Sequence, residues 1–344
     1  MDVPEAAVGS CIEKLGVRKG DRVVAYLPNI PEAIIAFLAT VSIGAIWSAC
    51  GPEFGVRSVI DRFKQIDPKV LITVDGYVFG GKEYLKEKDI EDISKGLPNL
   101  ENIIMISYLN ANHMKHKVIT WENVRQRLEP LDFEMVSFNH PLYIMYSSGT
   151  TGLTKGVMLT HFNLTSNVHQ FIDRNEQGII RHDEIVLVHL PLFHIYGLEV
   201  LMNASIGAGA TQVMMGRFNI DEFLGLLETH KVTMLFTAPP VGLALSQYPD
   251  LTNYDLSALR VGFIGAAPLS ADLQSRIQDR TGFPIIQGYG MTESSPVTNA
   301  DFMEPHLQRM GSIGPALPDT EQKVVDLVDD SKEVELNEIG ELMV

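Results

Sequence analysis

A single lysine stands among glycines and hydroxyl-bearing residues in the stretch 146–156, which has no acidic residue although the whole chain is acidic. Glycines leave backbone N–H groups free to face an anion, and hydroxyls and one ammonium add further donors. A buried strand at 141–146 precedes the stretch, and residues 157–170 can carry a helix after it. The pattern predicts a polyphosphate-binding loop formed by Ser147, Ser148, Gly149, Thr150, Thr151, Gly152 and Lys155.

A flexible turn is the alternative interpretation, because Ser, Gly and Thr are common in turns. Lys155 and the expected strand–loop–helix setting favour the phosphate loop. Two familiar loops are excluded, since neither the G-x-x-x-x-G-K-[ST] spacing nor the G-x-G-x-x-G fingerprint occurs in the chain.

Residues 147–156 resemble the phosphate loop of the AMP-forming adenylate ligases, which include acyl- and aryl-CoA synthetases, 4-coumarate–CoA ligases and luciferases. The family usually has proline where this chain has Thr154. Loss of a proline typically costs about 0.4–1 kcal/mol through the entropy of the unfolded chain, so we expect a looser loop that still functions. The runs 44–55, 61–68 and 74–77 resemble acetoacetyl-CoA synthetases in particular, whereas the chain after the loop is similar to coumarate ligases.

Residues 287–293, Gln-Gly-Tyr-Gly-Met-Thr-Glu, are a second match to this family. Glycines allow close backbone approach, a tyrosine ring can stack on adenine, and a carboxylate is a hard oxygen ligand for Mg²⁺. The resemblance assigns Thr292 to the α-phosphate and Glu293 to the metal. A glycine-rich turn that opens a helix is the alternative. The other residues expected to contact the nucleotide are Gln287, Gly288, Tyr289, Gly290 and Met291.

Two further loops match the family more weakly. The first is the adenine-edge loop Gly265, Ala266, Ala267 and Pro268, where small residues let a flat base lie against the backbone. The second is the run 190–197, in which the resemblance places His194 near the carboxylate, although a lone histidine in an apolar run is more often a core residue. Tyr196 and Val200 would line the acyl pocket, and an apolar residue at 200 favours an aliphatic or unsubstituted aromatic acid.

The resemblance implies that a carboxylate attacks the α-phosphate of ATP, pyrophosphate leaves, and coenzyme A then takes the acyl group. The cofactors would be ATP, Mg²⁺ and coenzyme A, and the catalytic residues His194, Thr292 and Glu293. Positioning and charge stabilisation should dominate such a reaction. The family continues beyond the sequence that ends at Val344 with a ribose-binding segment and a C-terminal domain. We therefore expect this polypeptide alone to bind ATP weakly and to adenylate slowly or not at all. The alternative is a non-catalytic nucleotide- or acyl-binding core that a separate domain completes.

Composition excludes several other classes. A net charge of −16 without a basic run argues against nucleic acid, and the chain has neither the G-x-S-x-G elbow of α/β-hydrolases nor the dinucleotide fingerprint. Residues 33–50 are uncharged, but Pro31 precedes them and they contain Thr40, Ser42, Gly44 and Ser48, which favours a buried helix and strand over a membrane span. His113 and His116 are expected in a solvated loop. Two cysteines and no signal peptide predict a cytoplasmic protein. The resemblance implies a small carboxylic acid as partner, and a homodimer is left open.

Alternating strand and helix patterns predict an α/β fold, with parallel-rich sheets flanked by helices in layered subdomains. Expected parts are 1–140, a first α/β subdomain; 141–310, a second that holds the ATP and acyl sites; and 311–344, the start of a small β-barrel-like subdomain. Ligands of open α/β sheets collect beyond the carboxyl ends of strands, where the phosphate loop, 265–268 and 288–296 are expected. Expected helices include 31–42, 56–65, 198–206, 220–230 and 270–280, and the charged residues 82–95 are expected to form a solvated helix with its flanking loop.

Overall fold

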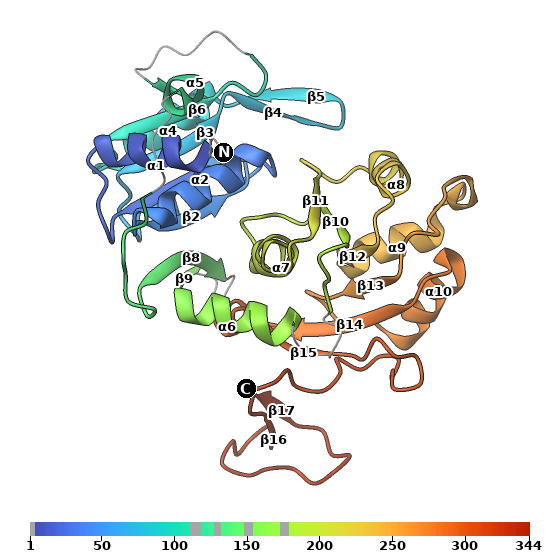
Figure 1. The fold of residues 1–344 in the computed structure, drawn as a ribbon. Helices are drawn as coiled ribbons and strands as arrows, with labels where there is room; N and C mark the ends of the chain where they lie inside the picture. Colours follow the sequence, from blue (N-terminus) through green and yellow to red (C-terminus); the bar gives the residue numbers. More distant parts are fainter. Residues whose placement is uncertain (1–3, 111–117, 127–131, 148–153, 173–178) are drawn as a thin grey trace. The chain divides into compact units, whose positions relative to one another are not determined.

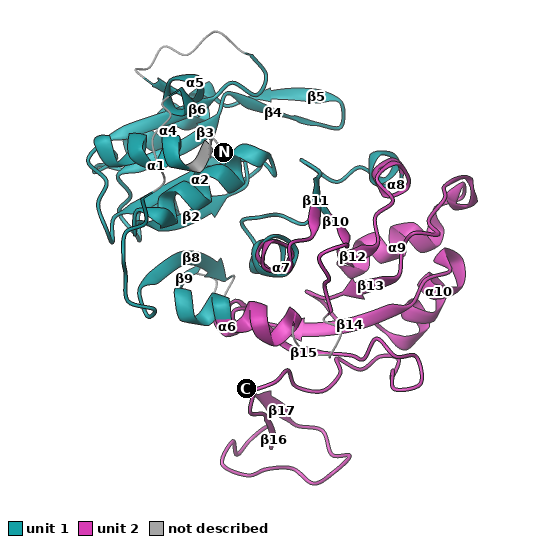
Figure 2. Cartoon of the chain, viewed as in Figure 1, with its two compact units in different colours: residues 1–165, 187–202, 212–224 teal, residues 166–186, 203–211, 225–344 magenta. Residues whose placement is uncertain are grey.

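The computed structural model describes residues 4–110, 118–126, 132–147, 154–172 and 179–344. The chain divides into two compact units, coloured separately in Figure 2. Unit 1 comprises Met1–Thr165, Leu187–Met202 and Gln212–Leu224, and unit 2 comprises Ser166–Val186, Asn203–Thr211 and Gly225–Val344. The three-part division at residues 140 and 310 stays a prediction.

Unit 1 is built on a seven-stranded sheet with the order β7-β6-β3-β1-β2-β8-β9. All neighbours from β7 to β8 pair in parallel, whereas β9 pairs antiparallel with β8. Strand β3 is buried along its whole length, as expected for a parallel sheet that is covered on both faces. The strands are β1 (Arg22–Tyr26), β2 (Ile46–Cys50), β3 (Val70–Val74), β6 (Asn102–Ile106), β7 (Ile119–Thr120), β8 (Pro141–Ser147) and β9 (Lys155–Thr160).

Helices α1 to α5 of unit 1 accompany this sheet, and α1 and α2 lie side by side (Figure 1). Helix α2 has the bounds predicted from sequence, because Pro31 suits the first helical position and Gly44, with a φ of 70°, follows its end. Helices α3 and α4 pack their apolar sides against β1 and β3 around Phe63 and Leu71. The helices are α1 (Pro4–Lys14), α2 (Pro31–Ser42), α3 (Val56–Phe63), α4 (Glu87–Gly96) and α5 (Trp121–Arg125).

A β-hairpin occupies the beginning of the range 82–95, where the sequence predicts a helix with its flanking loop. Strands β4 (Gly76–Phe79) and β5 (Lys82–Leu85) pair antiparallel, and α4 begins only at Glu87. The helix within this range is confirmed, but the residues before it form a strand rather than a loop, because Gly80 and Gly81 both adopt positive φ and form the turn. The charges of residues 82–85 therefore lie on an exposed strand.

Unit 2 is organised by strands β10, β12, β13 and β14, which pair in parallel, and by β15, which pairs antiparallel with β14. Helix α10 begins where predicted, because the Ser270 hydroxyl accepts a hydrogen bond from the Leu273 N–H, and Gly282 ends it with a φ of 81°. The unit boundary falls within α6, β10, η1, β11 and α8. The elements are α6 (His161–Ile172), β10 (Ile185–Val188), η1 (Tyr196–Asn203), α7 (Ala204–Ala208), β11 (Thr211–Met214), α8 (Ile220–Thr229), β12 (Met234–Thr237), α9 (Pro239–Gln247), η2 (Leu251–Asn253), β13 (Val261–Ile264), α10 (Ala271–Thr281), β14 (Ile285–Gly290), η3 (Thr292–Ser294), β15 (Val297–Ala300), β16 (Lys323–Val325) and β17 (Glu341–Met343).

The C-terminal strands, the two cysteines and the apolar stretch at 33–50 can be compared with the sequence analysis. Strands β16 and β17 form an antiparallel pair within residues 311–344, where a β-rich segment is expected. Cys11 and Cys50 form no disulfide, and burial raises the pKa of the Cys50 thiol to about 12, so that thiol stays protonated. Among the described helices, none has the length and apolar character needed to cross a bilayer.

His189 is a buried histidine whose protonation should weaken the fold at acid pH. Its ring packs edge-on against the Phe223 ring, with ring centres 5.0 Å apart. Burial lowers the pKa of His189 from 6.5 to about 4. Between these two pH values the unfolded chain binds more protons than the folded protein, so stability is lost as the pH falls through this window. The loss should reach about 3 kcal/mol of unfolding free energy by pH 4.

Urea unfolding at pH 7 and pH 4.5 measures this loss, and His189→Gln should flatten the difference relative to the unmodified protein. His306→Asn, at an exposed position, is the matched control and should leave it unchanged. An equal pH dependence in the unmodified protein and His189→Gln would show that folding does not lower the pKa of His189.

Candidate functional site

The phosphate-loop residues lie between two antiparallel strands of unit 1. Ser147, the last residue of β8, pairs with Lys155, the first residue of β9. The backbone of Lys155 is therefore fixed at the base of the loop, and its side chain is exposed to solvent. The loop residues Ser148, Gly149, Thr150, Thr151 and Gly152 lie outside the described residues.

The prediction of a helix at 157–170, directly after the loop, was partly wrong. Residues 155–160 form strand β9, and helix α6 begins only at His161. In β9, Leu159 is buried while Met158 is exposed, which is the alternation of a strand. Thr160 and Asn163 then cap the helix mutually, since each side chain accepts the other's backbone N–H at 3.2 and 3.0 Å. The setting is strand–loop–strand, so no helix dipole follows the loop directly.

A wide surface cleft of about 1200 Å³ lies beside Lys155 in unit 1. Arg57 and Arg62 of α3 line it together with Lys155 and its neighbours Thr154 and Gly156. Asp61 also lines the cleft and pairs with Arg57 at 3.9 Å, so the lining carries three cations and one acid. This local excess of positive charge can attract an anion although the chain has a net charge of −16, because screening limits the repulsion of distant acids to a Debye length of about 8 Å. Sequence reasoning missed Arg57 and Arg62, although residues 61–68 carried a signal as a family-like run.

The His194 loop is held in place by one buried amide of unit 1. The Asn29 side chain donates to the Leu190 carbonyl at 2.8 Å and accepts from the Leu192 N–H at 3.0 Å. His194 Nδ1 accepts the Tyr196 N–H at 3.2 Å, which leaves the other ring nitrogen as the donor in the neutral form. Although His194 is exposed, desolvation of the ring lowers its pKa, so at neutral pH an uncharged imidazole faces solvent.

The predicted acyl-pocket residues follow this loop on η1, a helix of the wide π type. Val200 is buried, with 3% of its surface exposed, and Tyr196 is half-buried. Sequence analysis expected an α-helix at 198–206, but the chain forms η1 followed by α7. A π-type turn inside a helix is uncommon and frequently marks a functional site.

In unit 2 the adenine-edge loop follows β13 and is anchored from β14. Gly265 is buried, while Ala266, Ala267 and Pro268 are exposed, and Ala266 has a φ of 71°, which is rare for a residue with a Cβ. The Gln287 side chain accepts the Leu269 N–H at 2.9 Å and is itself buried. Gln287 would thus hold the loop rather than contact a nucleotide.

The second motif begins inside β14, which runs to Gly290 because β15 pairs with it. A Cβ at Gly290 would lie 2.1 Å from the Pro296 carbonyl oxygen. Thr292 opens the short helix η3, which is stabilised by a 3.0 Å bond from the Met291 N–H to the Ser294 hydroxyl. Glu293 and Met291 are exposed, whereas Gly288, Tyr289 and Thr292 are half-buried. The exposed carboxylate of Glu293 fits a magnesium ligand.

The structure therefore gathers the site residues in two groups. Ser147, Lys155, His194, Tyr196 and Val200 belong to unit 1, and residues 265–268 and 287–293 belong to unit 2. The meeting of both groups around one triphosphate stays a prediction. In the described residues no cluster of three or more His, Cys, Asp or Glu side chains could hold a metal, and His113 and His116 lie outside those residues.

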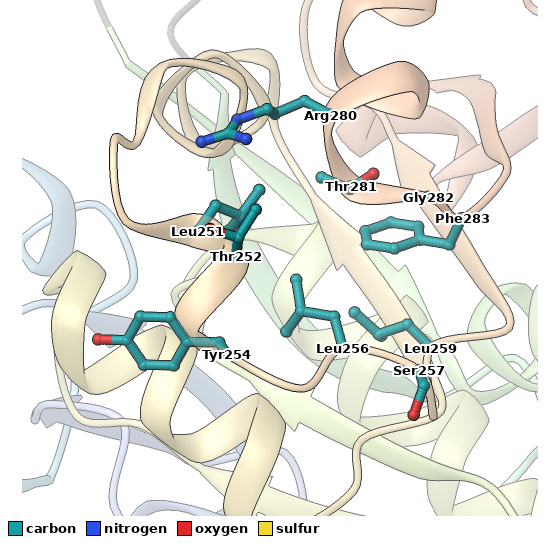
Figure 3. Close-up of a pocket in the computed structure, with 10 residues that line it drawn as sticks. All are labelled: Leu251, Thr252, Tyr254, Leu256, Ser257, Leu259, Arg280, Thr281, Gly282 and Phe283. Atoms are coloured by element: carbon teal, nitrogen blue, oxygen red, sulfur yellow. The ribbon is translucent and has the colours of Figure 1, made fainter.

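A pocket of about 350 Å³ in unit 2 lies apart from these loops (Figure 3). Leu256 and Leu259 come just before β13, and Phe283 comes just before β14, so the pocket is at the amino ends of these strands. Residues 265–268 and 288–293 lie at or beyond the carboxyl ends of the same strands, which is the usual ligand side of an α/β sheet. The pocket contains none of the predicted site residues.

A protein-family model described as AMP-binding enzyme matches residues 6–344. The chain belongs to the AMP-binding enzyme family. It is 36% identical over 326 residues to a 4-coumarate–CoA ligase from Vanilla planifolia, which covers 93% of this chain and 57% of the relative. It is also 36% identical over 328 residues to 4-coumarate–CoA ligase 1 from Petroselinum crispum, with the same coverage of both chains. These matches confirm the family predicted from residues 147–156 and 287–293.

Solved structures of AMP-binding enzymes confirm the predicted α/β fold. The acetoacetyl-CoA synthetase from Streptomyces lividans superposes with a TM-score of 0.86 at 27% identity, covering 99% of this chain and 53% of that one. The ATP-bound MatB from Rhodopseudomonas palustris has a TM-score of 0.83 at 25% identity, covering 99% and 63%. The chain thus spans a little more than half the length of the relatives it matches.

Proposed function

We propose that this chain uses ATP to activate a small carboxylic acid as an acyl-adenylate and then transfers the acyl group to coenzyme A. The observation that carries the proposal is the exposed Lys155 at the base of the phosphate loop, beside a cationic cleft, in a chain that matches the AMP-binding family from residue 6 to 344. Unit 2 would add the exposed Glu293 as a ligand for the metal and the half-buried Thr292 as a donor to the α-phosphate. The ligase names of the curated relatives support the same reaction.

In the first step a carboxylate oxygen forms a bond to the α-phosphorus, the bond from that phosphorus to the bridging oxygen breaks, and pyrophosphate leaves. Lys155 would hold the outer phosphates as a point charge, and the Thr292 hydroxyl would donate to the α-phosphate. A magnesium ion held by Glu293 would offset negative charge on the phosphates. His194, neutral at pH 7, would donate its free ring N–H to the carboxylate and orient it.

In the second step the sulfur of coenzyme A attacks the acyl carbon, the bond from carbon to the phosphate oxygen breaks, and AMP leaves. The thiol proton passes to solvent or to the departing phosphate. Val200 is buried and apolar on η1, which favours an aliphatic or unsubstituted aromatic acid over a hydroxylated one. We place the reaction in the cytoplasm, in agreement with the two reduced cysteines.

Trapping of the acyl-adenylate with hydroxylamine tests this function with a panel of carboxylic acids. The chain is assayed alone and with the C-terminal domain of a curated relative supplied as a separate polypeptide. We expect hydroxamate that requires both ATP and acid, more with the added domain, and more from aliphatic acids than from hydroxycinnamates. Faster turnover of hydroxycinnamates would contradict the assigned acid class. ATP binding without hydroxamate under either condition would instead support a non-catalytic nucleotide-binding core.

A further inference from the structure

Four side chains from separate parts of unit 1 form a continuous stack. The Arg62 guanidinium lies 5.9 Å from the centre of the Tyr146 ring and 5.0 Å from that of Phe54. The Phe54 ring contacts Phe193 edge to face, with ring centres 5.1 Å apart. Tyr146 immediately precedes Ser147 at the phosphate loop, and Phe193 immediately precedes His194. The stack thus joins the loop expected to hold ATP to the loop expected to hold the acid.

Arg62 is fixed at the centre of the stack by its own helix. Its guanidinium donates to the Ser58 carbonyl at 2.9 Å and also contacts the Ser58 hydroxyl. The Arg62 carbonyl accepts the Tyr146 hydroxyl at 2.6 Å, so Tyr146 is bound to this residue through both backbone and side chain. Because a planar guanidinium can contact rings on two sides, lysine cannot take its place here.

The turn that directly follows helix α3 reaches the opposite end of the phosphate loop. Gln65, three residues after Arg62, donates its side-chain amide to the Thr154 carbonyl at 3.3 Å. Both ends of the loop, at Tyr146 and at Thr154, are therefore bonded to this short segment of chain. A shift of α3 would move both ends of the loop together.

The far end of the stack depends on a glycine. A Cβ added at Gly51 would lie 2.4 Å from the Phe193 ring, so only glycine lets that ring reach Phe54. Gly51, Phe54 and Arg62 all belong to the runs 44–55 and 61–68 that the sequence analysis singled out without giving them a role. Both runs therefore contribute residues that build the same stack.

We propose that Arg62 is a positioning residue that sets the phosphate-loop strand and the His194 loop in one fixed geometry. This inference rests on the proposed function, since it assigns ATP to one loop and the acid to the other. Misplacing either loop would separate the attacking oxygen from the α-phosphorus, which lowers the rate of the chemical step more than it weakens binding.

Steady-state adenylation of Arg62→Lys and Arg62→Met tests the proposal, with Lys64→Met as the matched control because Lys64 is an exposed cation two residues further along. Both Arg62 variants should lower kcat by about tenfold, the scale that two cation–π contacts allow, with KM for ATP changed less than about twofold. A direct phosphate contact predicts instead that Arg62→Met raises KM for ATP while Arg62→Lys stays active. That result would overturn the proposal.

Hydrogen exchange measured by mass spectrometry gives a readout that does not need activity. In Arg62→Met, peptides covering 142–147 and 190–197 should both exchange faster than in the unmodified protein, whereas Lys64→Met should change neither. Unchanged exchange at 190–197 would overturn the proposal even if adenylation is observed. If the unmodified protein shows no adenylation but both peptides exchange faster in Arg62→Met, the proposed function is refuted. The role of Arg62 in positioning the two loops would still be supported.

Discussion

Replacing Lys155 by methionine is expected to lower ATP-dependent adenylation by about 10²–10³-fold, the usual effect of removing one group that stabilises transition-state charge. Lys155 is exposed at the first residue of β9, its backbone is fixed by pairing with Ser147, and it lines the cleft that also holds Arg62. Its ammonium can therefore reach an anion without a large rearrangement. Methionine keeps a long unbranched side chain but removes the charge.

Exchange of labelled pyrophosphate into ATP measures the effect of Lys155→Met. Lys323→Met is the matched control, because Lys323 is also exposed and also the first residue of a short strand, β16. We expect the control to stay within about twofold of the unmodified protein, as surface substitutions away from a site usually do. An Lys155→Met variant that retains more than a third of the exchange rate would remove Lys155 from the proposed site.

Replacing Arg260 by methionine is expected to reduce the unfolding free energy of unit 2 by about 3 kcal/mol, because it leaves a buried carboxylate short of its main partner. Glu184 is 1% exposed and accepts bonds from Arg260 at 2.6 and 3.1 Å. Arg181 also donates to Glu184 at 3.1 Å and would remain, which places the loss at the lower end of the range for buried pairs.

Chemical unfolding of Arg260→Met, followed by a probe in unit 2, measures this loss. Arg276→Met is the control, since Arg276 pairs with Asp272 on the exposed side of α10 and should cost less than about 1 kcal/mol. The double variant Glu184→Leu, Arg260→Met should be less destabilised than Arg260→Met alone, because no unpaired charge is left. Equal losses in Arg260→Met and Arg276→Met would show that the buried carboxylate needs no partner.

The sequence predicted correctly those helices whose ends are set by residues adjacent in the chain. Helix α2 is bounded by Pro31 and closed before Gly44, and α10 is capped by Ser270, so both were recognisable from the sequence. Strand β9 was missed because its pairing partner, β8, lies across the phosphate loop. The hairpin β4–β5 was missed because charged residues 82–85 are compatible with a helix until two positive-φ glycines turn the chain.

The candidate site shows the same division between local and distant information. Lys155 and Glu293 were found because each stands in a short motif with a definite chemistry. The stack around Arg62 was not found, because its rings come from positions 54, 146 and 193, and no local pattern connects them. Likewise Asn29 binds residues 190 and 192, more than one hundred and sixty positions along the chain.

Hydroxamate formation by Lys155→Met, Glu293→Gln and the double variant, compared with the unmodified chain, tests most directly whether both units act on a single ATP. If one triphosphate and its metal connect the two side chains, each single change should be severe, and the double change should be little worse than either, because groups that act as a unit are not additive. Full activity of Glu293→Gln, or losses that simply multiply in the double variant, would contradict this account.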